Sequence, residues 1–288
     1  MTIRTILLAA DSSHPAKVAA HQAKLLAEHF GAQLKVLHVL PYPLGIPGAP
    51  DHGLQLGEWF TGRAEQDISE LQSFFAPELN GLHVEWVVLE GDPAKQIVEY
   101  ADSNGVDLIV MPAHGQGPFR RFLLGSVTAK VLHDVECPVW TGIHREELSY
   151  SENLGINNVV CAITPGPQGA KLVGWASEIA ASFGAHLFMV HVIPHSESVN
   201  EEYFRPDASA PVTVRARERI EALREQCGAD ADVIIAGGEI HKAVCGELER
   251  LNADLLIIGR SPQWGAVGHL PTHAYAIVRD SRCPVVSV

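Results

Sequence analysis

The stretch MPAHGQGPFRRFLLGSV, residues 111–127, brings together residue types that suit the binding of an anion. It follows the apolar run DLIVM and leads into VTAKVLHDV, whose apolar residues recur at helical spacing. Gly125 and Ser126 would then stand at the start of a helix, where the first N–H groups have no partner within the helix and the helix dipole adds partial positive charge. Gly115 and Gly117 would allow backbone conformations with positive φ. The pattern predicts a phosphate-binding loop.

The motifs of several common nucleotide-binding and catalytic classes are missing from the sequence. It has no GxxxxGK[ST], which excludes a P-loop NTPase, and Gly115 begins no complete GxGxxG. It also has no GxSxG, no HExxH and no kinase HRD and DFG pair. Because no general base stands out, we predict no catalytic residue and leave enzymatic activity open.

Length, composition and charge restrict the class of protein. At 288 residues, with 47% hydrophobic and 19% charged residues, the chain is compatible with two globular domains. The formal net charge is −13 and both halves are acidic, which argues against a nucleic-acid partner. No uninterrupted apolar run approaches 18 residues, and the first residues reach Asp11 too soon for a signal peptide. We therefore expect a cytoplasmic protein with no membrane partner.

Cysteine and histidine are present without the spacing of a metal site. The five cysteines form no CxxC pair, which argues against both a zinc site and a disulfide framework. The fifteen histidines include His38 and His191 at equivalent positions of the two halves. His14, His21 and His29 lie along one predicted helix region without carboxylates at ligand spacing. No metal ligand is predicted.

The two halves of the chain repeat the same order of elements. Apolar runs predicted as strands alternate with segments of helical spacing, so that each half reads βαβαβαβαβ. Runs such as DLIVM and DLLIIG are apolar on both faces, as expected when helices cover both sides of a parallel sheet. The sequence predicts two tandem doubly wound α/β domains, residues 1–143 and 158–288, each with a five-stranded parallel sheet and about four helices. The polar stretch 144–157 is predicted as the linker.

Two variable segments, residues 41–59 and 194–211, are rich in Pro, Gly and Ser and follow the second strand of each half. We predict long loops at the carboxyl ends of those strands, where an open parallel sheet binds its ligands. A lid over a site and a tolerated insertion are both compatible with this placement.

The signature in the first half resembles that of the universal stress proteins in their tandem form, with similarity over nearly all of the chain. ATP-binding members of that family carry Gly-x-x-Gly, nine residues and Gly-Ser/Thr; this chain has Pro112-Ala-His-Gly115, nine residues and Gly125-Ser126. Pro112 departs from the first glycine, and a proline lacks an N–H and has a fixed φ. The resemblance implies an adenine nucleotide at the carboxyl edge of the first sheet, with its ligands at these positions: Asp11 and Val39 at the adenine end, and Gly115, Gly125, Ser126 and Val127 at the phosphate end.

Two of these positions have a structural alternative. Asp11 would equally serve as an Asx turn or cap for the helix that follows it. Val39 would equally serve in the core, because any contact with a ligand would come from its backbone.

The second half lacks most of the signature. Thr164 stands where the first half has Asp11, and Thr272-His273 stand nine residues after Gly259-Arg-Ser-Pro262. We predict a degenerate second domain whose main role is to pair with the first. The resemblance implies that the last strands, PVW at 138–140 and PVV at 284–286, pair edge to edge, so that the two domains pack as a pseudo-dimer; a homodimer of the chain is left open.

The sequence and the resemblance together predict a universal stress protein that binds ATP, or ADP or AMP, in its first domain, with Mg²⁺ as an accompanying ion. It would act in stress response or signalling, with slow ATP hydrolysis at most. One alternative is an interaction scaffold of the same fold that binds no nucleotide, because Pro112 breaks the motif. Another is a small hydrolase on the same fold, for which the spacing supplies no nucleophile and base.

Overall fold

The computed structural model describes residues 2–41, 53–113, 124–142, 154–166, 168–194, 206–260 and 272–288, and in three helices it describes side chains only from residues 66, 212 and 273 onward. The chain divides into two compact units, Thr2–Leu154 and Gly155–Val288. We refer to these units as domain one and domain two and describe each by itself.

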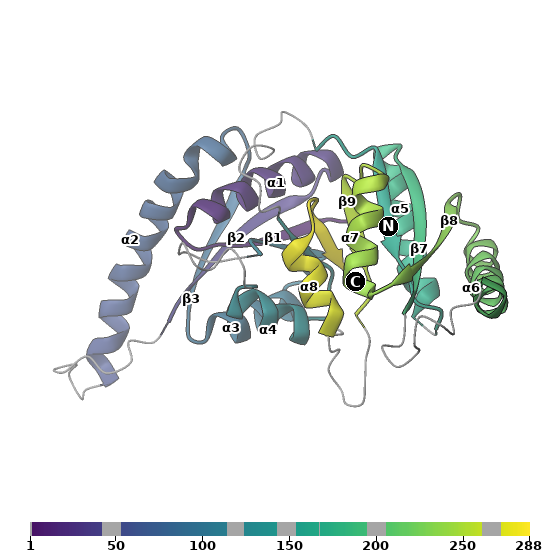
Figure 1. Ribbon diagram of the computed structural model, residues 1–288. Coiled ribbons are helices and arrows are strands. Elements are labelled where there is room, and N and C mark those ends of the chain that lie inside the picture. The colour runs from purple at the N-terminus through teal and green to yellow at the C-terminus, as the bar shows by residue number, and fades with distance from the viewer. Residues whose placement is uncertain are drawn as a thin grey trace. The chain divides into compact units, whose positions relative to one another are not determined.

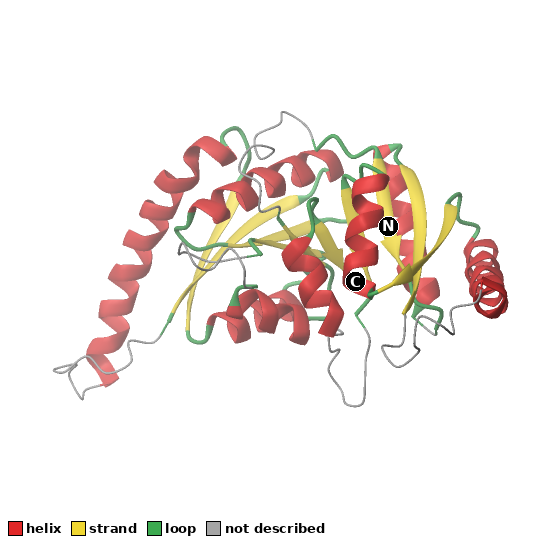
Figure 2. Ribbon diagram, viewed as in Figure 1, coloured by secondary structure: helices red, strands yellow, loops and turns green. Residues whose placement is uncertain are grey.

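Domain one alternates strands and helices along the chain (Figure 1): β1 (Thr5–Ala9), α1 (His14–Phe30), β2 (Gln33–Leu40), α2 (Gly53–Leu79), β3 (Val84–Glu90), α3 (Pro93–Ser103), β4 (Leu108–Met111), α4 (Ser126–Asp134) and β5 (Val139–Thr141). Its strands pair in parallel in the order β3-β2-β1-β4-β5. Helices cover both faces of this sheet, with α1 packed against α2 and α3 packed against α4 (Figure 2). The sheet order reverses direction between β1 and β4, which is where doubly wound folds bind their ligands.

Domain two repeats this arrangement: β6 (Asn158–Ala162), α5 (Gly169–Phe183), β7 (His186–Pro194), α6 (Pro206–Cys227), β8 (Asp232–Gly238), α7 (Ile240–Arg250), β9 (Leu255–Ile258), α8 (Thr272–Asp280) and β10 (Val285–Ser287). Its strands pair in parallel in the order β8-β7-β6-β9-β10. The predicted pair of tandem doubly wound domains, each with a five-stranded parallel sheet, is confirmed.

The central strands owe their position to continuous apolar runs. All four residues of β4, LIVM, and all four of β9, LLII, are buried, as helices on both faces require. An aspartate just before each of these strands fixes the start of its neighbour: Asp107 Oδ2 accepts hydrogen bonds from the Arg4 and Thr5 N–H groups at 2.8 and 2.9 Å. Asp254 Oδ2 accepts the equivalent pair from Asn157 and Asn158, both at 2.9 Å. We call these two contacts the aspartate staples.

The loops predicted at residues 41–59 and 194–211 are partly wrong. Helix α2 begins at Gly53 and helix α6 at Pro206, so the second part of each segment is helical. Proline is favoured in the first turn of a helix, where its missing N–H has no helical partner in any case. The glycines near the start of α2 belong to a helix of 27 residues, which tolerates them. Residues 42–52 and 195–205 lie outside the described residues, so the choice between lid and insertion stays a prediction. Most of the predicted linker, residues 144–153 of 144–157, also lies outside them.

Candidate functional site

The carboxyl edge of domain one brings the predicted adenine-end residues together. In the parallel register of β1 and β2, Ala9 is the partner of Leu37. Continuing that register by two residues sets Asp11 opposite Val39. Helix α4 follows β4 on the other side of β1, because β1 pairs with β2 on one edge and with β4 on the other. Asp11, Val39 and the α4 start therefore share the edge at which the sheet order reverses.

Asp11 is half-buried and already makes a local contact. Its Oδ1 accepts a hydrogen bond from the Ser13 N–H at 3.2 Å, which is the Asx turn that the sequence offered as the alternative. Ser13 is in turn the N-cap of α1, and its Oγ accepts the Ala16 N–H at 3.2 Å. The turn uses Oδ1 of the carboxylate; a contact with a nucleotide stays a prediction for this residue.

Val39 is buried, with 8% of its surface exposed, so the core role is observed for its side chain. Its backbone faces β1: the Leu37 carbonyl accepts the Ala10 N–H, while the Leu40 carbonyl accepts the Gly91 N–H beyond β3. Since peptide groups alternate between the two edges of a strand, the N–H and C=O of Val39 point to the side where β1 has ended at Ala9. That orientation leaves a backbone contact with a ligand open.

His38, which sequence analysis matched to His191 without assigning it a contact, supports the same edge. Its Nδ1 lies 2.9 Å from the Ala10 carbonyl oxygen, and because a carbonyl only accepts, Nδ1 carries the proton. The bond fixes the peptide that leads into Asp11. The equivalent positions of His38 and His191 in the two halves were the signal in the sequence.

Helix α4 begins at Ser126 with Gly125 as its N-cap, as predicted. Gly125 has φ −58° and ψ 139°, so it makes no use of the positive φ that glycine allows. Its N–H donates to the Ala113 carbonyl at 2.9 Å. The amides that the helix start offers to an anion are therefore those of Ser126, Val127 and Thr128, since the Ala129 N–H already donates to the Gly125 carbonyl. Gly115 lies outside the described residues.

Thr128 was missed by sequence analysis. Its side chain is buried, with 4% of the residue exposed, and its Oγ1 donates a hydrogen bond to the Pro112 carbonyl at 2.9 Å. Proline at this position has lost its N–H, yet its carbonyl ties the end of β4 to the first turn of α4. Thr128 had no signal in the sequence beyond its place two residues after Ser126.

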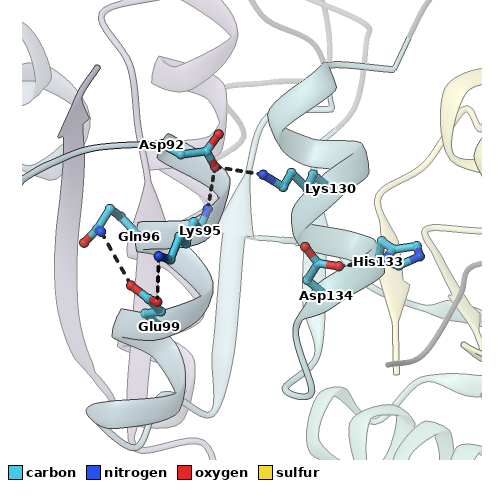
Figure 3. A network of polar contacts seen from close by, with 7 residues as sticks. All are labelled: Asp92, Lys95, Gln96, Glu99, Lys130, His133 and Asp134. Carbon is cyan, nitrogen blue, oxygen red and sulfur yellow. Dashed lines mark hydrogen bonds and ion pairs between the residues drawn. The ribbon is translucent and has the colours of Figure 1, made fainter. Parts of the chain in front are cut away.

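A polar network connects α4 to the start of α3 (Figure 3). Asp92 is the N-cap of α3, and its Oδ1 accepts the Lys95 N–H at 2.9 Å and Lys130 Nζ of α4 at 3.0 Å. The backbone bond from Lys95, followed by the bond from Lys130, lowers the pKa of the Asp92 carboxyl. At the next turn of α4, His133 contacts the adjacent Asp134. The network holds α4 beside α3, with Asp92 just past the end of β3.

The same edge of domain two repeats one of these contacts and differs at another position. His191 Nδ1 lies 2.8 Å from the Ile163 carbonyl, which repeats the His38 contact. Thr164 then follows where domain one has Asp11.

The start of α8 shows how its residues correspond to those of α4. Buried positions match when α8 is aligned with α4 at a spacing of 146 residues, so that Ala274, Ile277 and Val278 correspond to Thr128, Val131 and Leu132. In this register Pro271-Thr272 correspond to Gly125-Ser126, whereas the sequence alignment had matched Thr272-His273 to Gly125-Ser126.

Metal ligation and reactive thiols find no support in the described residues. These contain no group of three or more His, Cys, Asp or Glu placed to hold a metal ion. The five cysteines are free thiols, and burial raises the pKa of Cys161 and of Cys283 to about 12. Both are therefore protonated at neutral pH. Among the described helices, none combines the length and apolarity needed to cross a membrane.

Comparison with known proteins decides the family. The model of the universal stress protein family matches residues 2–141 and again residues 155–288. The chain belongs to the universal stress protein family. The double match makes it a tandem member, in which each family unit coincides closely with one of the two compact units.

Relatives of this universal stress protein match one unit or both. A universal stress protein of Thermus aquaticus is 37% identical over 140 residues, which cover 47% of this chain and 96% of the relative. One from Methanocaldococcus jannaschii is 30% identical over 139 residues, 47% of this chain and 79% of the relative. A crystal structure of a universal stress protein from Archaeoglobus fulgidus aligns with 99% of this chain and 96% of its own, with a TM-score of 0.67 and 21% identity. That likeness shows a shared fold over both domains.

Proposed function

We propose that this tandem universal stress protein binds an adenine nucleotide at the carboxyl edge of domain one and acts as a ligand-dependent module in stress response or signalling. One observation carries the proposal: the strand register sets Asp11 opposite Val39 on the edge where β4 gives way to α4. Of the positions that the family resemblance assigns to the two ends of the nucleotide, those within the described residues thus belong to one edge of one sheet.

Different groups at that edge suit the two ends of a nucleotide. The second carboxylate oxygen of Asp11 would accept from a ribose hydroxyl or a base amine, and the backbone of Val39 would pair with the base edge. The N–H groups of Ser126 and Val127 would donate to phosphate oxygens, with the positive end of the α4 dipole behind them. The protein as a whole is acidic, and these amides provide local attraction for an anion.

ATP is the proposed ligand, with ADP and AMP as weaker ones that lose phosphate contacts. Since the described residues hold no cluster of carboxylates for a metal, Mg²⁺ would be carried by the phosphates of the nucleotide. No hydrolytic step is assigned, because no general base is identified among the described residues of the edge.

Domain two is proposed to be a structural partner that does not bind the nucleotide. Thr164 replaces the carboxylate of Asp11, and Pro271 replaces the glycine that permits close approach at the helix start. Its sheet and helices nevertheless follow those of domain one element by element.

Isothermal titration of the full chain with ATP and Mg²⁺ tests the proposal, after a denatured sample has been checked for nucleotide retained through purification. We expect ATP to bind and Asp11→Ala to weaken both ATP and adenosine, while the matched variant Thr164→Ala leaves both affinities unchanged. A correctly folded protein that retains no nucleotide and binds none would support the interaction scaffold instead. Rapid turnover of ATP would favour the hydrolase.

A further inference from the structure

Two hydrogen bonds fasten the end of β4 to the start of α4 in domain one. The Gly125 N–H donates to the Ala113 carbonyl at 2.9 Å, and Thr128 Oγ1 donates to the Pro112 carbonyl at 2.9 Å. Ala113 and Thr128 are buried, with 3% and 4% of their surfaces exposed. We call this pair of bonds the clasp. Breaking a buried bond of this kind costs free energy, because it leaves the acceptor without a donor. The two bonds therefore resist movement of α4 relative to the end of β4.

The clasp determines where the anion-binding amides lie. Gly125 is the N-cap of α4 and Thr128 is the third residue of the helix. The two bonds of the clasp therefore hold the residue just before Ser126 and the residue just after Val127. Those two amides are thereby held relative to the carboxyl end of β4. They lie at the same edge of the sheet as Asp11 and Val39, because β1 pairs with both β2 and β4. Donors that are already in place when a ligand arrives bind more tightly, because less ordering remains to be done on binding.

The threonine half of the clasp belongs to domain one alone. In the helix register of the two domains Ala274 corresponds to Thr128, and an alanine has no hydroxyl to donate. Position 274 is buried like position 128, so packing alone is satisfied by a small residue there. The hydroxyl therefore occurs in the domain with the nearly complete signature and is missing from the domain that has lost it.

From these contacts we infer that the side chain of Thr128 is a positioning group for the phosphate end of the ligand, acting through Pro112 without itself touching the nucleotide. This inference rests on the proposed function of domain one. It also explains how proline is accepted at the first position of the signature: what the site uses there is the carbonyl, which proline keeps. Loss of the clasp is expected to weaken ligands in proportion to their phosphate contacts and to leave the adenosine part unaffected.

The test compares Thr128→Val with Thr128→Ser in the full chain. Valine keeps the branched shape and removes the hydroxyl, whereas serine keeps the hydroxyl. Lys130→Met is the matched control, because it removes the bond from α4 to Asp92 and leaves both bonds of the clasp in place. Affinities for ATP and for adenosine are measured by titration calorimetry. We expect Thr128→Val to weaken ATP about fivefold, the effect of one hydrogen bond on an equilibrium, with adenosine unchanged. Serine should restore ATP affinity, and Lys130→Met should change neither ligand.

Each other outcome has a distinct meaning. Equal weakening of ATP and adenosine, or no change in either, would show that Thr128 serves only the fold and would overturn the inference. If the wild-type chain binds neither ligand, the proposed function fails, and amide hydrogen exchange then decides the clasp by itself. In that measurement Thr128→Val should speed exchange at Gly125 and Ala129, whose N–H groups bond to Ala113 and Gly125, relative to Leu132, and unchanged exchange would refute the clasp.

Discussion

The two domains share the contacts that build the sheet and differ in those that surround its carboxyl edge. Both have an aspartate staple, a histidine whose Nδ1 binds the carbonyl after the first strand, and a matching set of buried positions in the last helix. At the edge, domain one has Asp11, Ser13 and Thr128, whereas domain two has Thr164, Gly166 and Ala274. The fold is therefore maintained without the edge residues.

That separation divides the polar residues into two groups. A contact found in both domains serves the fold, because domain two keeps it after losing the signature. A contact found only in domain one is a candidate for function. Ser13 shows the limit of this rule, since it caps α1 in domain one while α5 has Gln168 at its N-cap without a side-chain bond. A difference between the domains thus selects candidates, and each needs a test of its own.

The largest difference between the domains is expected from a change at the start of α4. Ser126→Pro removes one amide donor and one hydroxyl, yet it suits the first position of a helix, and the ψ of 139° at Gly125 is compatible with a following proline. We expect ATP affinity to fall by about tenfold or more, as for the loss of a hydrogen bond to a charged group. Ser126→Ala should cost less, and Thr272→Pro in domain two should cost nothing. Equal effects of the two proline variants in a binding titration would break the comparison.

The aspartate staples should show the opposite behaviour, with equal effects in both domains. Asp107→Ala and Asp254→Ala each leave two backbone N–H groups without their shared acceptor. Each change is expected to lower the free energy of unfolding by about 1–3 kcal/mol, measured by urea denaturation. A cost confined to one domain would mean that the staples are not equivalent.

Two tryptophans with buried indole nitrogens sharpen the comparison further. Trp140 Nε1 donates to the Oε1 of the buried Gln22 at 3.0 Å, whereas Trp175 Nε1 is buried and has no hydrogen-bond partner among the residues that the structure describes. Trp140→Phe should therefore destabilise its domain more than Trp175→Phe does, by about 1 kcal/mol. Thermal denaturation of the two variants measures this difference. A larger loss from Trp175→Phe would contradict the assignment.

The smallest effect is expected at the starts of α3 and α7. The Lys95 N–H and Lys130 lower the pKa of Asp92, and Lys242 lowers that of Glu239. A carboxyl whose folded pKa is depressed stabilises the protein above its unfolded pKa, and this stabilisation is lost as the pH falls through the folded pKa. The ordinary pKa values of an aspartate and a glutamate are 3.8 and 4.5, so the loss is expected below those values. In an NMR titration Lys130→Met should raise the pKa of Asp92 and leave Glu239 unchanged.

Much of the architecture was accessible from the sequence because it depends on patterns that repeat. Continuous apolar runs predicted the buried strands, and the recurrence of the same order of elements predicted two domains. The starts of α2 and α6 were missed because glycine and proline, which usually mark loops, also occur in the first turns of helices. The contact of Thr128 with Pro112 joins residues 16 positions apart through a side chain, and no local pattern reports such a bond.

The number of nucleotides bound by one chain tests the central claim most directly. Native mass spectrometry of the full chain with ATP and Mg²⁺, repeated with Ser126→Pro and Thr272→Pro, counts the ligands and assigns them to a domain. The account predicts one nucleotide per chain, whose occupancy at a fixed ATP concentration falls in Ser126→Pro and is unchanged in Thr272→Pro. Two nucleotides per chain, or one that disappears only in Thr272→Pro, would contradict it.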